Sequence, residues 1–246
     1  MKIWHIVIIA LLVFAFIKRA SLVSAWANIQ FHKGENEKAL ETFEFADKIG
    51  NMSPKNLWAY GYMLLRQGRL DDARTVLTRA SLSVSKPQIK NPIKSLLALV
   101  EWKSGNLPLA IEMLEDVIEE YKTTAIYQNL GLLYVLGDDK EKALKFNLEA
   151  YDFNSEDMII MDNLAEAYAM CGETEKAEEI YERLISKEPH FPEAYYGYGL
   201  LLVGKGERGR GIELIRQSLN KRFSFLSVRT HDEIKEMLGE IISDEK

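Results

Sequence analysis

The chain is poor in the residues that usually build catalytic or disulfide-stabilised sites. It has one cysteine, four histidines and six prolines in 246 residues. Cys171 has no partner for an internal disulfide, so cysteine usage leaves the redox compartment open. The low proline content, together with 47% hydrophobic residues, is typical of a folded, helix-rich protein and argues against disorder.

The histidines and the cysteine form no pattern typical of a metal site or a nucleophile. No two of His5, His32, His190 and His231 lie three or four positions apart, and the sequence has no Cys-x-x-Cys pair. Cys171 precedes the glycine of a turn, and no sequence feature supplies the base that a nucleophilic thiol needs. We therefore predict no metal, no cofactor and no enzymatic activity.

Phosphate-bearing ligands have equally little support. Residues 199–206 match a phosphate-binding loop except at the last position, where Gly206 replaces the Ser or Thr that binds magnesium. No strand is expected before this segment, and its glycines suit a helix contact and a turn.

The formal net charge is −6, and residues 1–19 contain three cations and no acid. The rest of the chain is therefore more acidic still, which argues against nucleic-acid binding, and we predict no small-molecule substrate.

The one long hydrophobic run lies at the amino terminus. Residues 3–17 are apolar except for His5, and Lys2 and the pair Lys18-Arg19 flank them. As a helix the run would be about 22 Å long, shorter than a hydrocarbon core of roughly 30 Å, although flanking cations can extend its reach. We interpret residues 1–19 as a single-pass membrane anchor. The cations after the run favour a cytoplasmic carboxyl-terminal domain.

Two other interpretations of this run stay open. Ala25-Trp26-Ala27 offers a small-x-small cleavage site, which would make the run a signal peptide and the protein extracytoplasmic or secreted. Signal peptides, however, carry their positive charge before the apolar run, whereas here the Lys-Arg pair follows it. The run could also be a buried helix at the end of a helical array.

Most of the remaining sequence is one pattern repeated six times. In each copy a turn opened by glycine or aspartate precedes a small residue. These small residues are Ala39, Ala73, Ala110, Ala143, Ala177 and Gly211, separated by steps of 34, 37, 33, 34 and 34 residues. A period near 34 with a helix-breaking turn indicates pairs of helices stacked in series.

The second copy shows how the pattern predicts a helix pair. Leu57, Tyr60, Gly61 and Leu64 recur at helical spacing, Gly68 makes the turn, and Ala73, Leu77 and Ala80 form the buried stripe of the second helix. A glycine ends the first helix because it reaches the left-handed conformation at little cost. Small residues stand where the two helices are expected to cross, since a larger side chain would force their axes apart.

These residues make the chain resemble the tetratricopeptide repeat (TPR) family. The resemblance implies an all-α, right-handed superhelical solenoid of about six TPR helix pairs, in which the first helix of each pair lines a concave groove. We expect units at residues 20–53, 54–90, 91–123, 124–157, 158–191 and 192–225, followed by a capping helix and tail at 226–246. Ser85–Pro92 is expected to form a long loop, and Gly211 to weaken its helix by about 0.5–1 kcal/mol relative to alanine.

The resemblance also implies which side chains face the groove. In peptide-binding members of the family, asparagine at the position of Asn129 and Asn163 grips the main chain of the ligand, because an amide offers both a donor and an acceptor. The other predicted groove residues are Trp58, Tyr62, Arg66, Leu99, Trp102, Lys103, Gln128, Leu132, Val135, Asp162, Glu166 and Tyr196. Only Arg66 and Lys103 could contribute to a clamp for a carboxyl terminus, so that ligand is not indicated.

We therefore expect a non-catalytic adaptor that holds an extended peptide or a partner protein in its groove at a membrane surface. The alternative is a structural subunit of an envelope or secretion assembly that binds through its convex face. In that case Arg69, Arg74 and Arg79, or the terminal helix, would carry the interaction.

Overall fold

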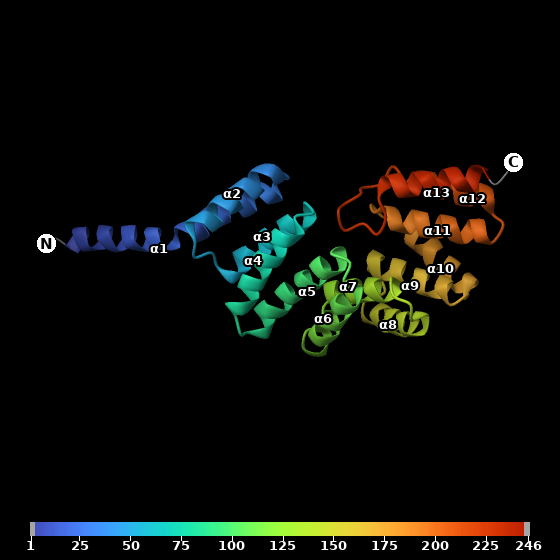
Figure 1. The fold of residues 1–246 in the computed structure, drawn as a ribbon, viewed down its shortest axis with the longest axis horizontal. Coiled ribbons are helices and arrows are strands. Elements are labelled where there is room, and N and C mark those ends of the chain that lie inside the picture. Colours follow the sequence, from blue (N-terminus) through green and yellow to red (C-terminus); the bar gives the residue numbers. More distant parts are fainter. Residues whose placement is uncertain (1–2, 244–246) are drawn as a thin grey trace. The chain divides into compact units, whose positions relative to one another are not determined.

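The computed structural model describes the backbone of residues 3–243, while the side chains at positions 3, 6 and 9–18 lie outside the description. Residues 3–243 form thirteen α-helices and contain no strand (Figure 1). The helices are α1 (Ile3–His32), α2 (Asn36–Ile49), α3 (Pro54–Arg66), α4 (Leu70–Leu82), α5 (Pro87–Lys103), α6 (Leu107–Glu120), α7 (Thr124–Val135), α8 (Lys140–Phe153), α9 (Met158–Met170), α10 (Thr174–Ile185), α11 (Pro192–Gly204), α12 (Arg208–Ser218) and α13 (His231–Ser243).

The helices form two compact units. Unit 1 comprises residues 1–100 and unit 2 comprises residues 101–246, so the boundary falls within α5. In unit 1, α1 packs on α2 and α3, and α3 packs on α4. In unit 2, each helix from α6 to α13 packs on its neighbour in the chain, and α9 also contacts both α7 and α11. This succession of packed pairs confirms an all-helical solenoid.

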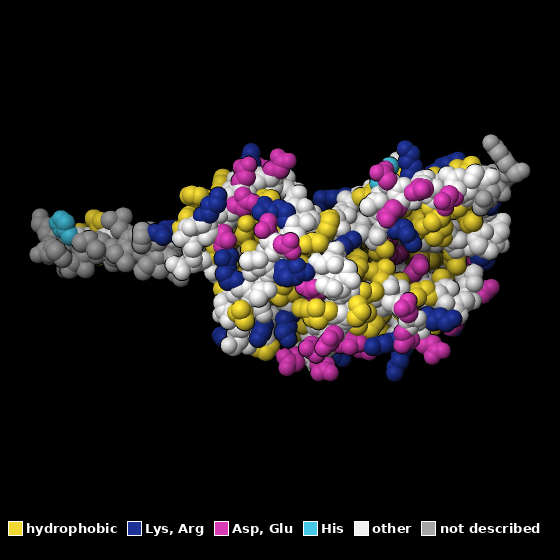
Figure 2. All heavy atoms as spheres, in the orientation of Figure 1, with side chains coloured by type: hydrophobic (Ala, Val, Ile, Leu, Met, Phe, Trp, Pro, Cys, Tyr) yellow, Lys and Arg dark blue, Asp and Glu magenta, His cyan; other side chains and the backbone are white. Residues whose placement is uncertain are grey.

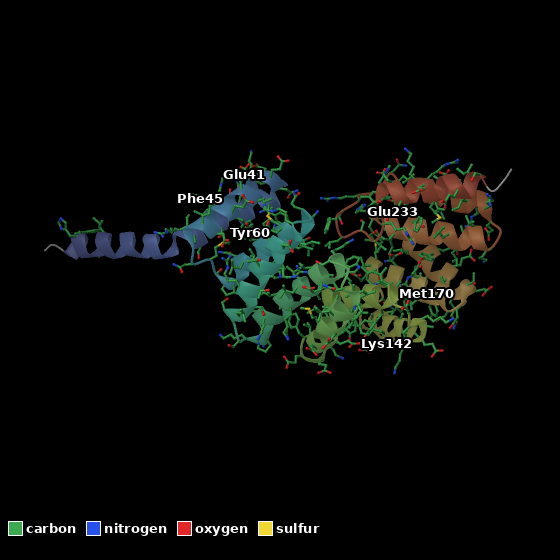
Figure 3. All side chains as sticks on the ribbon, in the orientation of Figure 1. Glu41, Phe45, Tyr60, Lys142, Met170 and Glu233 are labelled. Carbon is green, nitrogen blue, oxygen red and sulfur yellow. The ribbon has the colours of Figure 1, made fainter. Side chains whose placement is uncertain are left out.

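Unit 1 is held together by aromatic and aliphatic contacts between helix pairs. Phe43 on α2 stacks on Tyr60 of α3 with ring centroids 5.8 Å apart, and both side chains are buried. An added Cβ at Gly61 would lie 2.5 Å from the side chain of Leu77, so α3 and α4 cross as closely as the repeat pattern predicts. Phe45, by contrast, lies on the exposed side of α2, where 58% of it is accessible (Figure 3).

The turns inside the pairs use glycine as expected. Gly68 between α3 and α4 has φ +72°, and the turn glycines of four other pairs also have positive φ. The amide of Gly68 donates to the carbonyl of Leu65, and the amide of Arg69 donates to the carbonyl of Leu64. These bonds satisfy carbonyl groups at the end of α3 and reverse the chain within a few residues.

The prediction of a membrane anchor is wrong. Among the residues that the structure describes, no helix is long and apolar enough to cross a membrane, and the localisation inferred from the anchor falls with it. Most side chains of the run 3–17 lie outside the described set. The run does not form a separate helix, because α1 continues through Lys18 and Arg19 to His32. The later part of α1 belongs to the first helix pair, where Ala20 and Ala27 are buried.

The segment between the second and third pairs is shorter than predicted. Instead of a loop through Pro92, α5 begins at Pro87 and contains Pro92 within its length. Proline suits the first position of a helix, where its missing N–H has no partner to lose. The backbone carbonyl of Pro92 accepts a hydrogen bond from Nε1 of Trp58 at 3.2 Å, which ties α5 to α3 within unit 1.

Charged side chains of both signs are interspersed over the visible face of each unit (Figure 2). Some pair between neighbouring helices. Nζ of Lys142 on α8, labelled in Figure 3, lies 2.6 Å from Oε1 of Glu115 on α6, and the hydroxyl of Tyr134 donates to the same carboxylate. Lys142 and Glu115 are both substantially exposed, so such a pair contributes only about 0–1 kcal/mol.

The last helix covers the end of unit 2. Ile234 and Leu238 on α13 are buried against Tyr196, Ile212 and Ile215 of the last pair. The predicted amphipathic terminal helix is therefore present, beginning at His231. It closes a face that would otherwise expose apolar side chains of α11 and α12.

Gly211 lies at the crossing of α11 and α12, as its place among the small repeat residues predicts. A Cβ added at Gly211 would lie 2.6 Å from the carbonyl oxygen of Gly199, and one at Gly199 would lie 2.8 Å from the carbonyl oxygen of Gly211. The two glycines therefore let α11 and α12 touch backbone to backbone. Glycine at position 211 lowers helix propensity, but this packing requires it.

Candidate binding cavity of unit 2

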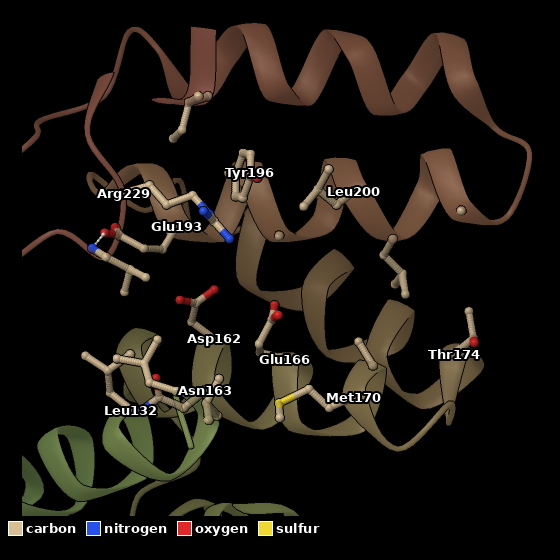
Figure 4. A pocket seen from close by; sticks show the side chains of 18 of the residues that line it. Leu132, Asp162, Asn163, Glu166, Met170, Thr174, Glu193, Tyr196, Leu200 and Arg229 are labelled. Carbon is tan, nitrogen blue, oxygen red and sulfur yellow. Dashed lines mark hydrogen bonds between the residues drawn. The ribbon is translucent and has the colours of Figure 1, made fainter. Parts of the chain in front are cut away.

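A cavity of about 700 Å³ opens in unit 2. Three first helices of successive pairs, α7, α9 and α11, provide most of its wall (Figure 4). The start of α10, the segment before α13 and the first turn of α13 also contribute. Leu132, Met170 and Leu200 give it apolar surface, while Asp162, Glu166, Glu193 and Arg229 give it charge. A cavity of this size with a few convergent polar groups is typical of a binding site.

Asp162 and Glu166 project from α9, one turn apart, into this cavity (Figure 4). Among the described residues, no hydrogen-bond donor or cation pairs with Asp162. Burial raises the pKa of Asp162 well above its usual value, and the nearby carboxylates of Glu193 and Glu166 raise it further. Asp162 is partly accessible through the cavity, so we attribute this effect to a confined site rather than to complete enclosure.

Glu166 is held in place from behind. Its Oε2 accepts a hydrogen bond of 2.9 Å from the hydroxyl of the buried Tyr181 on α10. Gly197 on α11 makes room for this bond, since a Cβ there would lie 2.4 Å from the Tyr181 oxygen and 3.2 Å from Oε2 of Glu166. Gly197 occupies the repeat position of Asn129 and Asn163. The last pair therefore has no side-chain amide at this position.

Glu193, in the first turn of α11, holds the segment that joins α12 to α13, which we call the connecting segment (residues 219–230). Its Oε1 accepts a hydrogen bond of 3.0 Å from the backbone N–H of Val228. At the other end of the segment, the backbone N–H of Arg222 donates to the carbonyl of His190. The connecting segment is thus attached to α11 and to the turn before it, and its later part borders the cavity.

Tyr196 and Arg229 stand together at the cavity (Figure 4). The guanidinium carbon of Arg229 lies 5.5 Å from the centre of the Tyr196 ring, within the range of a cation–π contact. Tyr196 is only 7% exposed, and its hydroxyl oxygen is buried with no hydrogen-bond partner among the described residues. Burial raises the pKa of this hydroxyl. An unpaired buried hydroxyl is costly.

Lys103 binds the connecting segment. Its Nζ donates to the carbonyl of Ser227 at 2.8 Å and lies 4.3 Å from the ring centre of Trp102 and 5.5 Å from that of Phe225. Burial lowers the pKa of Lys103, an effect that the carboxylates of Glu193 and Glu233 oppose. The structure therefore places Trp102 and Lys103 against the chain itself.

The predicted amides also have partners inside the fold. Nδ2 of Asn163, which is 3% exposed, donates to the carbonyl of Gln128 at 2.9 Å. Nε2 of Gln128 donates to both carboxylate oxygens of Asp157, the residue that caps the start of α9. Asn129 is half-buried on α7. Asn163 lines the cavity, and a grip of Asn129 and Asn163 on a ligand stays a prediction.

In unit 1 the predicted aromatic and cationic residues form a separate cluster. Trp58 stacks on Tyr62 with the ring planes 7° apart, Phe31 meets Tyr62 edge-on, and Arg66 lies 5.7 Å from the Tyr62 ring centre. Leu99 is buried on α5. These contacts order the side chains of unit 1, and their role in binding stays a prediction.

The arginines of the alternative convex interface are engaged in ion pairs. Arg69 pairs with Glu44 and Asp72, and Arg79 pairs with Asp47. Arg74 lies 3.2 Å from Asp71. The pairs of Arg69 with Glu44 and of Arg79 with Asp47 join α4 and its N-cap to α2 on the surface of unit 1, so a partner would have to compete for them.

Of the predicted groove residues, the cavity brings together Leu132, Val135, Asp162, Asn163, Glu166 and Tyr196. Sequence reasoning missed Glu193 and Arg229. Glu193 lies outside the groove positions that the family resemblance supplies, and Arg229 lies in the connecting segment, which no repeat position describes. The only signal for either was the charge of its side chain.

Comparisons with known proteins agree with this architecture. Family models described as tetratricopeptide repeat match residues 160–220 and residues 57–79. A TPR repeat-containing protein of Methanocaldococcus jannaschii is 26% identical over 164 residues, which is 66% of this chain and 28% of that protein. The chain therefore spans less than a third of this relative.

Solved structures share the fold at low identity. A tetratricopeptide repeat protein from Parabacteroides merdae superposes with a TM-score of 0.73 and 15% identity, covering 92% of this chain and 85% of the other. A chain of the APC/C hetero-tetramer Cut9–Hcn1 gives 0.71 and 14%, covering 89% and 42%. A thermophilic TPR protein of Thermus thermophilus gives 0.63 and 20%, covering 77% and 99%.

Tetratricopeptide repeat models thus match two segments of the chain, and solved tetratricopeptide repeat proteins share its fold. Proteins of this family generally mediate protein–protein interactions and are typically non-catalytic scaffolds.

Proposed function

We propose that this protein is a binding scaffold that holds an extended segment of a partner protein in the cavity of unit 2. The observation that carries the proposal is the cavity itself. It measures about 700 Å³ and is lined by three successive first helices with apolar and charged side chains side by side. A partner segment would gain apolar burial from the helices and orientation from the charges.

A further observation supports binding as the activity. One of the similar solved structures, a chain of the APC/C hetero-tetramer Cut9–Hcn1, is part of a protein complex. We extend that mode of action, assembly through a helical repeat surface, to this chain.

The test uses a library of random short peptides displayed on phage and selected on the immobilised full-length protein. Selected peptides are then measured against a variant in which the cavity is filled, Ala169→Trp, since Ala169 lines it. Glu179→Gln, an exposed carboxylate on the neighbouring helix α10, is the matched control. We expect Ala169→Trp to abolish binding and Glu179→Gln to preserve it. If no peptide is selected, or if both variants bind equally, the cavity is not the binding site.

A further inference from the structure

The geometry points to the chemistry of the ligand: we propose that the cavity of unit 2 takes a cationic side chain, the lysine or arginine of an extended partner segment, beside Asp162, Glu166 and Glu193. This inference rests on the proposed binding function and adds the class of partner. It follows from the charges of the cavity wall, from a buried unpaired hydroxyl and from the apolar side chains that line the same cavity.

Asp162 supplies the main argument. Its carboxylate points into the cavity from α9, and no described cation or hydrogen-bond donor pairs with it (Figure 4). A confined carboxylate without a partner lowers the stability of the folded protein, because it loses hydration and gains no compensating interaction. A cation from a partner would remove that cost by forming a charge-assisted hydrogen bond.

The other two carboxylates are fixed around Asp162 by hydrogen bonds from uncharged donors, and Glu193 also interacts with the charge of Lys103. Oε2 of Glu166 accepts from the Tyr181 hydroxyl at 2.9 Å, and Oε1 of Glu193 accepts from the Val228 amide at 3.0 Å. These bonds fix the orientation of both glutamates. Rigid support of this kind is what a binding group needs to act at a defined place.

The wall next to the carboxylates suits a long cationic side chain. The chain's own Arg229 lies over the ring of Tyr196 at 5.5 Å, so a guanidinium is compatible with the side chains of this wall. The Tyr196 hydroxyl oxygen at this wall is buried without a described partner. Leu132, Met170 and Leu200 line the same cavity and can cover the methylene stem of a lysine or arginine.

A free metal ion fits this site less well. Within the described part of the chain, no group of three or more His, Cys, Asp or Glu side chains is arranged for metal coordination. A guanidinium or ammonium group needs only hydrogen bonds from dispersed acceptors and a hydrophobic surface for its stem. The observations therefore favour a side chain over an ion.

The test uses peptides selected as described above, resynthesised with each arginine replaced by glutamine and each lysine by methionine. Dissociation constants are measured by titration calorimetry with wild-type protein, Asp162→Asn and the control Glu179→Gln. We expect one cationic position to be shared by the selected peptides. Its replacement should weaken binding to wild type by about 10- to 100-fold, the range for a charge-assisted hydrogen bond, and should change binding to Asp162→Asn far less.

The outcomes separate this inference from the proposed function. If peptides bind in the cavity but neutral replacements leave the dissociation constants unchanged, or if acidic residues are enriched, the cationic ligand is excluded and the scaffold stands. If Asp162→Asn and wild type discriminate equally between charged and neutral peptides, Asp162 is not the acceptor and the inference fails. If no peptide is selected, both proposals fall. A thermal unfolding scan of Asp162→Asn separates lost binding from lost fold.

Discussion

At the scale of single residues, the cavity contains a group that does not serve stability. Burial and two neighbouring acids raise the pKa of Asp162 well above its usual value. The groups around it are Glu166, Glu193 and Tyr181, with Arg229 at the same cavity. Residues that cost stability often mark binding sites, because a position optimised for a ligand is not optimised for the empty fold.

Replacing Asp162 by asparagine should therefore stabilise the protein, and the gain should depend on pH. A carboxyl group with a raised pKa in the folded state contributes stability below its unfolded pKa and loses it as pH rises through the folded pKa. The Asp162→Asn variant should melt about 2–4 °C higher than wild type at about pH 8, the shift that about 1 kcal/mol produces in a chain of this size. Near the ordinary aspartate pKa the difference should disappear.

Thermal scans by circular dichroism across this pH range measure the effect. The control Glu179→Gln should shift little at any pH, because the Glu179 side chain is exposed. A lower melting temperature for Asp162→Asn at high pH would mean that the carboxylate is stabilised by a partner in the fold.

A second residue-scale prediction concerns Gly211. Alanine there should destabilise the protein by about 1–3 kcal/mol through overpacking, despite a helix propensity better by about 1 kcal/mol. The cause is the carbonyl oxygen of Gly199, which a Cβ at position 211 would approach to 2.6 Å. Gly209→Ala on the same helix is the control, since a Cβ there meets nothing within 4 Å. Urea unfolding of both variants checks this, and a stabilised Gly211→Ala would refute the backbone contact.

At the scale of elements, the connecting segment depends on a few side chains. It lies between α12 and α13, and three hydrogen bonds hold it. The amide of Val228 donates to Glu193, Lys103 donates to the carbonyl of Ser227, and the amide of Arg222 donates to the carbonyl of His190. Two of these three attachments use a single charged side chain. The position of Arg229 at the cavity therefore depends on residues distant from it in sequence.

Replacing Glu193 by alanine should release the Val228 end of this segment. The hydrogen bond from the Val228 amide to a charged acceptor contributes about 1.5 kcal/mol at the lower end of the usual range, so exchange of this amide should accelerate about tenfold. Hydrogen–deuterium exchange followed by NMR measures it. The amide of Arg222 is an internal control, because it donates to the backbone of His190. Equal exchange at Val228 in both proteins would show that Glu193 does not hold the segment.

At the scale of the whole molecule, a solenoid exposes an apolar face at each end unless something covers it. Helix α13 supplies that cover for unit 2 through Ile234 and Leu238. Helix α13 follows the six pairs that α1 to α12 form.

Removing part of this cover should weaken the protein strongly. Ile234→Ala deletes a side chain that is 1% exposed and should cost about 2–5 kcal/mol. Ile242→Ala on the same helix removes a side chain that is 37% exposed and should cost much less. Denaturant titrations of both variants test this. Similar midpoints for the two would mean that α13 adds little to the stability of unit 2.

Local patterns in the chain were sufficient to predict the helix pairs, their turn glycines and the terminal helix. A repeat of about 34 residues encodes each pair through contacts between near neighbours, as in α3 and α4, where Gly61, Gly68 and Ala73 specify the crossing and the turn. Groove positions repeat with the same period, which is why Asp162, Glu166 and Tyr196 were expected on one surface.

Tertiary structure decided the features that depend on residues far apart in the chain. The continuity of α1 follows from its packing on α2 and α3, the need for Gly211 from the backbone of Gly199, and the presence of Arg229 at the cavity from the contacts of Glu193 and Lys103. These are contacts between elements, and periodicity within one element carries no information about them. The physical reason is that a repeat determines how each pair folds on itself, whereas the chemistry of a cavity depends on which side chains several elements bring together.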